Sequence, residues 1–85
     1  MRFMVTVRLE IPPERRGEIP ALRQAEDAHV AEQMRLGRLE ASYVSQEQPP
    51  TIWAILKADS LEDAQRQVAD YPFYPFMRLT YTPLA

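Results

Sequence analysis

Hydrophobic and polar residues alternate over the first ten positions of the chain. Successive side chains of a strand point to opposite faces, so this pattern predicts a strand over residues 2–10. The strand should end at Pro12, because proline has no N–H for a sheet ladder. The polar run up to Glu18 is expected to be a loop. The apolar face of the strand consists of Phe3, Val5, Val7 and Leu9.

The hydrophobic period becomes helical between Pro20 and Leu36. Proline fits the first turn of a helix, and Gly37 fits the position just beyond the last turn, where a left-handed backbone is common. The sequence therefore predicts a long helix over this range. Its apolar stripe holds Ile19, Leu22, Val30 and Met34.

Three more strands are predicted in the rest of the chain. Residues 39–46 alternate weakly, and residues 51–58 are mostly apolar. Both patterns favour strands, the second one buried on both faces. Residues 76–82 show a strand pattern again near the end of the chain.

A second helix is expected to begin at Ser60, with Asp63 three residues later as an imperfect capping box. Glu62 and Arg66 have the (i, i+4) spacing of an ion pair on the exposed side of this helix. The buried side is expected to hold Leu61, Ala64 and Val68.

The predicted order is β-α-β-β-α-β, which is typical of the ferredoxin-like fold. In this α+β sandwich, two helices cover one face of a four-stranded antiparallel sheet. The strand over residues 51–58 is apolar on both faces, and Trp53 and Ile55 lie on the face without helices, as does Met4. A second copy of the chain, packed sheet to sheet, is the simplest cover. The sequence thus predicts a homo-oligomer, at least a dimer.

Composition limits the classes of function. The chain of 85 residues has a formal net charge of −2, so we expect one domain (1–85) that does not bind nucleic acid. Without cysteine and with one histidine, it cannot form a Cys-type zinc site or a multi-His metal centre of its own. No apolar run reaches the roughly 20 residues of a membrane span, and no signal-peptide pattern leads the chain. A cytoplasmic protein that does not bind membranes is therefore expected.

Glu26 falls between Leu22 and Val30, in the middle of the apolar stripe of the long helix. Partial burial there would raise the pKa of its carboxyl group towards the range useful to a general base. Alternatively, the side chain reaches solvent or pairs with Arg23 or a loop group. His29 lies one turn beyond, and it is interpreted as a catalytic proton carrier or orienting partner, or else as a solvated helix residue.

Arg8 and Arg78 lie on strands that are neighbours in the predicted topology. Either one could bind a substrate carboxylate through two parallel hydrogen bonds. The alternative is an ion pair across a subunit interface, with Glu10 or Glu40.

Aromatic side chains could wall a pocket for a flat small molecule. Trp53, Phe73 and Phe76 are the candidates, and Pro72 and Pro75 should hold the two phenylalanines rigidly at the end of the sheet. The alternative role is packing in the core or in a subunit interface. The same two interpretations, pocket wall or packing residue, apply to Tyr43, Tyr74 and Tyr81.

The segment of residues 71–79 reads YPFYPFMRL and leads into the last predicted strand. Its prolines should push Tyr71 and Tyr74 towards extended backbone. It resembles the Leu-Pro-Leu-Phe-Pro-Tyr-Met run of muconolactone isomerases. The identical positions are Pro72, Pro75 and Met77, and the conservative ones are Phe73, Tyr74 and Phe76.

The first strand, from Phe3 to Pro12, also resembles that of the family, and the order of elements agrees over nearly the whole chain. The resemblance implies a dimeric α/β barrel, which in this family assembles further into decamers. It also implies an enzyme that moves a double bond within a small lactone: a base removes a proton next to the carbonyl, and the proton returns two carbons away. Glu26 would be the base and an arginine would hold the carboxylate, with no metal or organic cofactor.

One region departs from the family pattern. The family has a Trp-Arg-Ile-(Ala/Val)-Gly run in the second strand, whereas residues 41–50 read ASYVSQEQPP, without arginine or glycine. The carboxylate-binding residue is therefore missing or moved, for example to Arg78. Two hypotheses stay open. The first is a cofactor-free isomerase of a small unsaturated lactone or ring acid in aromatic-compound catabolism, with Glu26 as base. The second is a non-catalytic oligomeric domain that binds a small ligand or is purely structural.

Overall fold

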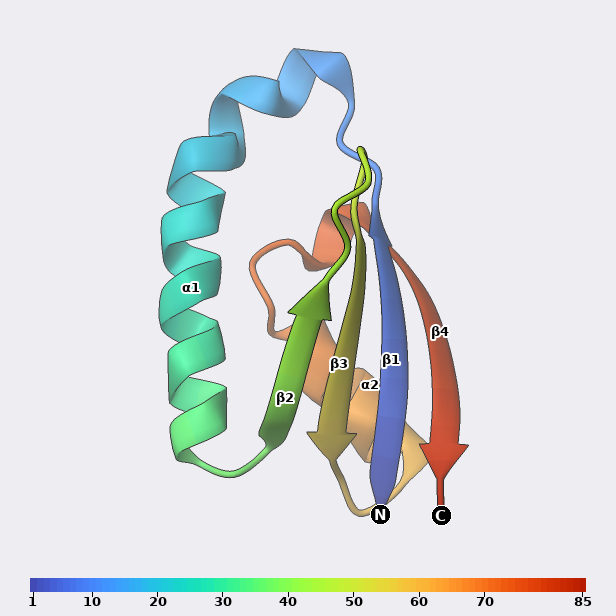
Figure 1. The fold of residues 1–85 in the computed structure, drawn as a ribbon. Helices are drawn as coiled ribbons and strands as arrows, with labels where there is room; N and C mark the ends of the chain where they lie inside the picture. Colours follow the sequence, from blue (N-terminus) through green and yellow to red (C-terminus); the bar gives the residue numbers. More distant parts are fainter.

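The chain forms a four-stranded antiparallel sheet with the strand order β2-β3-β1-β4, and two α-helices lie on one face of the sheet (Figure 1). A computed structural model describes all residues, 1–85. The predicted ferredoxin-like order is confirmed. The elements are β1 (Arg2–Leu9), the 3-10 helix η1 (Pro13–Glu18), α1 (Ile19–Arg35), β2 (Leu39–Val44), β3 (Thr51–Lys57), α2 (Leu61–Ala69), the 3-10 helix η2 (Tyr74–Phe76) and β4 (Met77–Leu84).

Two segments differ from the sequence-based expectation. The polar run expected as a loop contains η1, with Pro13 in its first turn. Tyr74, expected in extended backbone, instead begins η2, and its N–H donates to the carbonyl oxygen of Tyr71 at 2.9 Å. The fixed φ of Pro75 is also compatible with a 3-10 turn, and the turn's hydrogen bonds decide between the two conformations.

Helix α2 lies against the sheet and supplies much of the core cover, because Ala64 and Val68 are buried as predicted. The prediction for Leu61 is wrong, since this residue in the first turn is 45% exposed. As predicted, Ser60 caps the helix, accepting a hydrogen bond from the Asp63 N–H at 3.0 Å. The predicted pair between Glu62 and Arg66 is wrong: Arg66 Nη2 lies 3.2 Å from Asp63 Oδ1 instead. On a helix, an (i, i+3) partner lies as close as an (i, i+4) partner, so Asp63 can take the place of Glu62 as the partner of Arg66.

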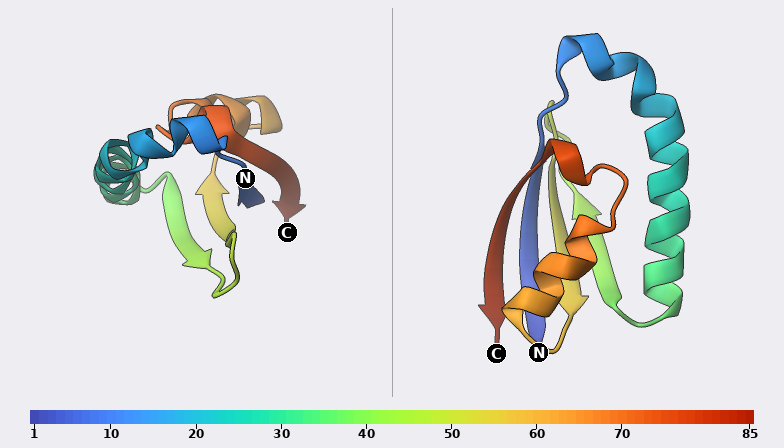
Figure 2. Two further views of the ribbon diagram at one scale, coloured as in Figure 1. Left: turned by 90° about the horizontal axis from the view of Figure 1, so that it is seen from above. Right: turned by 180° about the vertical axis from the view of Figure 1, so that it is seen from behind.

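Helix α1 stands beside the β2 edge of the sheet, apart from α2 (Figure 2). None of its residues is fully buried, and its contacts are mainly with β2 and η1. The predicted apolar stripe is partly wrong, since Met34 is 44% exposed. Each four-residue step turns by about 40° around the helix, so a row that starts at Leu22 has rotated away from the sheet at Met34. Gly37 ends the helix as predicted, with φ of +76°.

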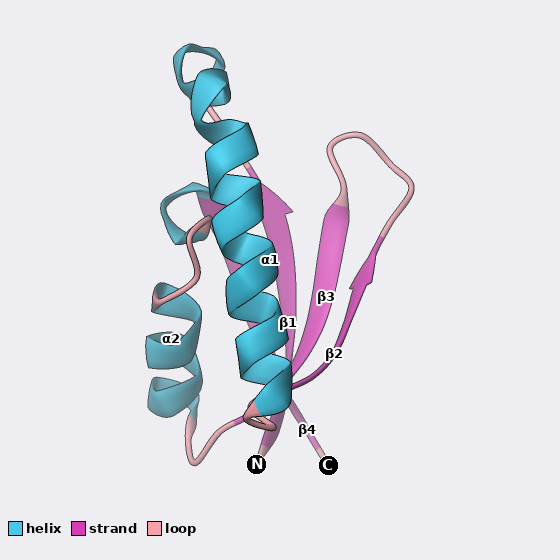
Figure 3. Ribbon diagram, turned by 90° about the vertical axis from the view of Figure 1, so that its left-hand side faces the viewer, coloured by secondary structure: helices cyan, strands magenta, loops and turns pink.

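The other face of the sheet is covered by no helix (Figure 3). Cross-strand partners place Met4 opposite Ile55 and Thr6 opposite Trp53 on this face, as the alternation along each strand predicts. Tyr43, which pairs with Trp53, is 61% exposed. We call these residues the open face: Met4, Thr6, Tyr43, Trp53 and Ile55.

Candidate active site

A mostly apolar groove lies between α1 and the helix-covered face of the sheet. It consists of two adjoining cavities of about 60 and 200 Å³. The groove exists because α1 stands off from the sheet and does not pack closely onto it. We call it the inner groove. The residues that line both cavities are Glu26, Val30, Ser42, Ile52 and Met77.

Glu26 projects into the inner groove from the middle of α1 and is half-buried. Its Oε1 accepts a hydrogen bond of 3.2 Å from the backbone N–H of Phe73, in the connection between α2 and β4. Burial raises the pKa of Glu26 above its ordinary value and outweighs the opposing effects of this hydrogen bond, of His29 and of Arg23. The carboxyl group is therefore a stronger base than a solvated glutamate.

Pro72 and Phe73 explain why this hydrogen bond forms. Proline offers no N–H, so Phe73 supplies the first backbone donor of the turn. The Phe73 side chain is only 4% exposed and anchors the turn in the core. A buried N–H without a partner would be costly, and Glu26 is its only partner in the chain.

Tyr71 lines the inner groove, and His29 contacts Tyr71. Their rings meet edge to face, with centroids 4.4 Å apart and an interplanar angle of 78°. Burial, and secondly the nearby charge of Glu26, raise the pKa of Tyr71 to about 12, so its phenol stays protonated at neutral pH. His29 Nε2 is buried and has no hydrogen-bond partner within the chain. A base and a protonated phenol thus line the inner groove, and an imidazole contacts the phenol.

The predicted substrate-binding residues fall into two groups. Phe73 lines the inner groove near Glu26. Phe76 is buried in the core, with the Arg15 guanidinium 4.7 Å above its ring centroid, so it supports the α2–β4 connection and does not line the inner groove.

The second group, Arg8, Arg78 and Trp53, lies on the face of the sheet opposite to Glu26. Arg8 and Arg78 are directly opposite each other on neighbouring strands, as predicted. Arg78 Nε donates to Glu10 Oε2 at 2.9 Å, so the ion pair expected across a subunit interface forms within one chain. In this chain, these three residues cannot contact a molecule that touches Glu26.

Sequence reasoning missed the placement of Tyr71 and Arg23 in the site. The proline pattern predicts only the backbone of Tyr71, although a tyrosine beside a rigid proline turn is well placed to line a pocket. For Arg23, the sequence predicts only a possible pairing with Glu26. Arg23 lines the 200 Å³ cavity, and its position one turn before Glu26 on α1 was the available signal.

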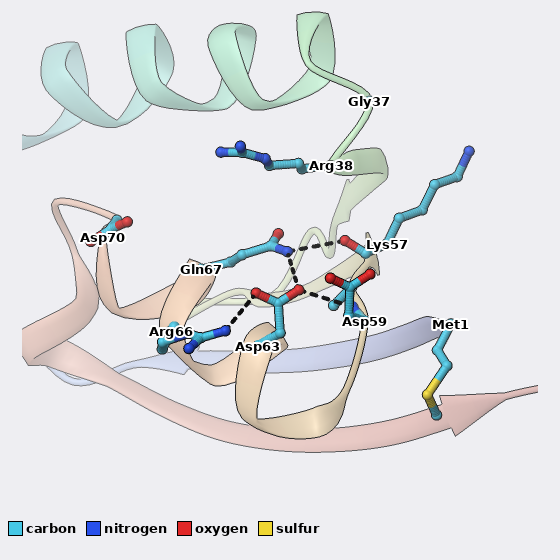
Figure 4. A pocket seen from close by; sticks show the side chains of 10 residues that line it. Met1, Gly37, Arg38, Lys57, Asp59, Asp63, Arg66, Gln67 and Asp70 are labelled. Atoms are coloured by element: carbon cyan, nitrogen blue, oxygen red, sulfur yellow. Dashed lines mark hydrogen bonds and ion pairs between the residues drawn. The ribbon is translucent and has the colours of Figure 1, made fainter.

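A polar cavity of about 590 Å³ lies at the other end of the molecule, near the N-terminus (Figure 4). Asp63 is its most engaged group: it accepts from Asp59 N–H at 2.9 Å, Gln67 Nε2 at 3.3 Å and Arg66 at 3.2 Å. These donors, the Asp59 N–H first, lower the pKa of Asp63. A carboxylate bonded in this way acts as a cap of α2 and is a poor base, so the inner groove is the better candidate site.

No three His, Asp or Glu side chains are grouped so that they could share a metal ion. None of the helices combines the length and the apolar character needed to cross a membrane.

Comparison with known proteins identifies the family of the chain. The family model described as muconolactone delta-isomerase matches residues 1–85. The chain belongs to the muconolactone delta-isomerase family. The resemblance carried by the proline-aromatic segment is thereby confirmed. No curated protein matches the sequence.

Two solved structures share the fold. A muconolactone isomerase determined at 3.3 Å resolution has a TM-score of 0.84 and 16% identity, over 100% of this chain and 88% of that one. The 5-chloro-2-hydroxyhydroquinone dehydrochlorinase from Burkholderia phenoliruptrix AC1100, in complex with 2,5-dihydroxybenzoquinone, has a TM-score of 0.72 and 14% identity, over 100% and 94%. At such low identity, the two structures establish only the fold of this muconolactone delta-isomerase family member. Its activity must be inferred from the residues of the site.

Proposed function

We propose that this protein is a cofactor-free isomerase that shifts a C=C bond in a small unsaturated lactone or ring acid during the breakdown of aromatic compounds. The observation that carries the proposal is Glu26, a half-buried carboxyl group with a raised pKa on the wall of an apolar groove. Membership of the muconolactone delta-isomerase family supports the reaction class.

In the proposed reaction, Glu26 removes a proton from a carbon that is conjugated with the lactone carbonyl. The electron pair of the broken C–H bond moves through the C=C bond to the carbonyl oxygen and gives a dienolate. The protonated Glu26 then returns the proton two carbons away, and the carbonyl re-forms with the double bond shifted. Atoms and electrons balance within the substrate and one carboxyl group, so no oxidant or reductant takes part.

The neighbours of Glu26 suit this reaction. The Phe73 N–H donates to Oε1, so Oε2 has no hydrogen bond within the chain and can serve as the basic atom. The Tyr71 phenol, protonated because its pKa is about 12, can donate a hydrogen bond to the enolate oxygen as negative charge develops there. His29, stacked edge-on against Tyr71, has a free buried nitrogen that can carry the proton or fix the phenol.

The open face supports the second part of the proposal, that the protein is a homo-oligomer. Trp53, Ile55 and Met4 form an apolar surface on strands β3 and β1 with no cover from the chain itself. A second copy of the same face would cover it by two-fold sheet-to-sheet packing. Such packing would leave the inner groove, on the other side of the sheet, open to substrate.

The test is proton NMR of the purified protein with muconolactone in deuterated buffer. We expect deuterium to enter the carbon beside the carbonyl while the ring signals of the starting lactone disappear. Glu26→Gln should abolish this exchange. Glu32→Gln, which changes an exposed carboxylate on the same helix, is the matched control and should exchange at the wild-type rate.

Two outcomes would count against the isomerase. Absence of exchange from a folded wild-type protein would leave a small-ligand-binding or structural role for the groove. Equal exchange by the wild type and Glu26→Gln would show that a different group is the base.

A further inference from the structure

A second, wider cavity adjoins the inner groove at the end of the molecule where η1 and the β2–β3 loop lie (Figure 1). Its volume is about 620 Å³, within the roughly 300–1,000 Å³ range of small-molecule sites. We call it the outer cavity. Leu9 and Phe73 line both this cavity and the 200 Å³ part of the inner groove, so the two spaces are neighbours. A molecule that extends out of the inner groove at this end therefore enters the outer cavity.

The two spaces together exceed what a single ring requires. A closed apolar cavity of about 150 Å³ is large enough to bind benzene. The 200 Å³ part of the inner groove, which Glu26 lines, thus has room for one small ring. The outer cavity, with 620 Å³, contains none of the groups that the proposed reaction uses. It is free to hold a second part of the same molecule.

The walls of the outer cavity are largely apolar and come from four segments of the chain. They are Leu9 and Ile11 at the end of β1, Ile19 at the start of α1, Pro49 and Pro50 in the β2–β3 loop, and Phe73 in the α2–β4 connection. Such walls favour an apolar group, because its transfer from water to an apolar surrounding is favourable.

The β2–β3 loop forms one wall and is fixed at its base by two hydrogen bonds. The Ser45 N–H donates to the carbonyl oxygen of Thr51, and the Thr51 N–H donates to Ser45 Oγ, both at 2.9 Å. Pro49 and Pro50 add two fixed φ angles. This wall exists without a ligand, so a ligand loses little affinity to the ordering of the loop.

Arg16 indicates that the group in the outer cavity is aromatic. Arg16 lines the cavity and forms no ion pair within the chain. A guanidinium group stacks favourably over the face of an aromatic ring. The same kind of contact occurs next to it in the chain, where the Arg15 guanidinium lies 4.7 Å from the centroid of the Phe76 ring. An alkyl group would bury similar area without this contact.

We propose that the substrate has two rings: a lactone or ring acid that lies in the inner groove beside Glu26, and an aryl substituent that lies in the outer cavity. This inference rests on the isomerase proposed above and narrows its substrate class to aryl-substituted lactones or ring acids. The reaction that supplies such a compound must open one ring of a two-ring aromatic compound and leave the other ring intact.

Binding of phenol and 4-phenylphenol tests the two-ring site without any turnover. 4-Phenylphenol should bind about tenfold to a hundredfold more tightly, as burial of one more ring predicts. It should shift the methyl NMR signals of Ile11 and Ile19, whereas phenol should shift only those of the inner groove, Val30 and Ile52. Ile19→Trp, which fills part of the outer cavity, should abolish the preference. Met34→Trp, which adds the same side chain at an exposed position of α1, is the matched control and should keep it.

Kinetics connect the two-ring site to the reaction. For the wild type, kcat/KM should be at least tenfold higher with a phenyl-substituted muconolactone than with muconolactone itself. Ile19→Trp should bring this ratio to one or below. Ile11→Trp changes a different segment of the same wall and should have the same effect, which guards against a folding defect in either variant.

The two proposals fail in different ways. Tighter binding of 4-phenylphenol with shifts at Ile11 and Ile19, but no turnover of either lactone, would support the two-ring site and reject the isomerase. Turnover of muconolactone together with equal binding of phenol and 4-phenylphenol would overturn the two-ring site and leave the isomerase standing. A preference for the two-ring compounds that both Ile19→Trp and Ile11→Trp leave intact would also overturn it.

Discussion

The backbone N–H of Phe73 donates a hydrogen bond of 3.2 Å to Glu26 Oε1, across 47 positions of sequence. This bond ties the middle of α1 to the connection between α2 and β4. It links the family's proline-aromatic segment to the carboxylate predicted as the base. The rigid turn therefore has a second role besides redirecting the chain, since its N–H binds one oxygen of Glu26 and leaves the other without a hydrogen bond within the chain.

Glu26→Gln should lose activity and gain stability. The amide oxygen can still accept from Phe73, but it cannot take a proton, and loss of a general base typically costs about 10²–10⁴-fold in rate. Deuterium exchange with muconolactone would measure this loss. Because burial penalises the charged form of Glu26, the neutral amide should raise Tm at pH 7. A lowered Tm would contradict the burial penalty, and full activity would contradict the role as base.

The stability gain of Glu26→Gln should depend on pH. Folding raises the pKa of Glu26, so the protonated form is favoured in the folded state. Its contribution to stability is fully present below the unfolded pKa and is lost as the pH rises through the folded pKa. The Tm difference between variant and wild type should thus be largest at neutral pH and shrink in acid. Thermal denaturation between pH 4 and 7, at one protein concentration, would measure it. A difference that grows in acid would mean that folding lowers the pKa of Glu26.

The value of kcat/KM should also depend on the protonation of Glu26, but it should rise as the carboxyl group loses its proton. Only the carboxylate form of Glu26 can remove a proton, so kcat/KM for muconolactone should fall as the pH drops through its raised pKa. The acid limb should have its midpoint above the pKa of a solvated glutamate. A midpoint at or below that ordinary value would indicate that the catalytic base is solvated.

Tyr71→Phe should lower kcat with little change in KM or Tm. The phenol has no hydrogen-bond partner in the chain, so its removal leaves the fold intact, while a developing enolate loses a donor. We expect a loss of about tenfold to a hundredfold, below the 10²–10³-fold typical of a full oxyanion-hole donor. The matched control is Tyr74→Phe, which removes an exposed phenol from the same segment. Equal rates for the two variants would remove Tyr71 from the mechanism.

The sequence predicted the elements well because each depends on local patterns. Alternation along residues 2–10 identified β1, and Ser60 and Gly37 marked helix ends that the structure confirms. The position of Glu26 in the apolar stripe is also a local property, and it allowed either partial burial or a solvent-exposed side chain; the structure shows the half-buried one.

Which residues lie near Glu26 in the site could not be predicted from local patterns. Which face of the sheet a strand residue shares with Glu26 depends on strand order and register, and these put Arg78 on the far face, bonded to Glu10. Helix α1 contacts mainly β2 and η1 and stands off from the sheet, and this tertiary packing, which creates the inner groove, is not a local property of the sequence. Tyr71 meets His29 only through that packing.

His29→Phe should separate packing from chemistry. Phenylalanine keeps the edge-to-face contact with Tyr71 and removes a buried nitrogen that has no partner, so Tm should stay level or rise. If His29 carries the proton, deuterium exchange should slow at least tenfold despite this stability. Unchanged exchange would make His29 a packing residue and leave proton return to Glu26 alone.

Ile55→Arg should break the proposed oligomer. Ile55 lies in the centre of the open face, opposite Met4 on β1 and Ala41 on β2, and a charge there would be buried without a partner between two copies. Light scattering coupled to size-exclusion chromatography should show an oligomer for the wild type and a smaller species for the variant. Met34→Arg is the matched control, since it adds the same charge to an exposed apolar position on α1 and should leave the assembly unchanged. A monomeric wild type, or dissociation by Met34→Arg alone, would show that the open face is not the contact between copies.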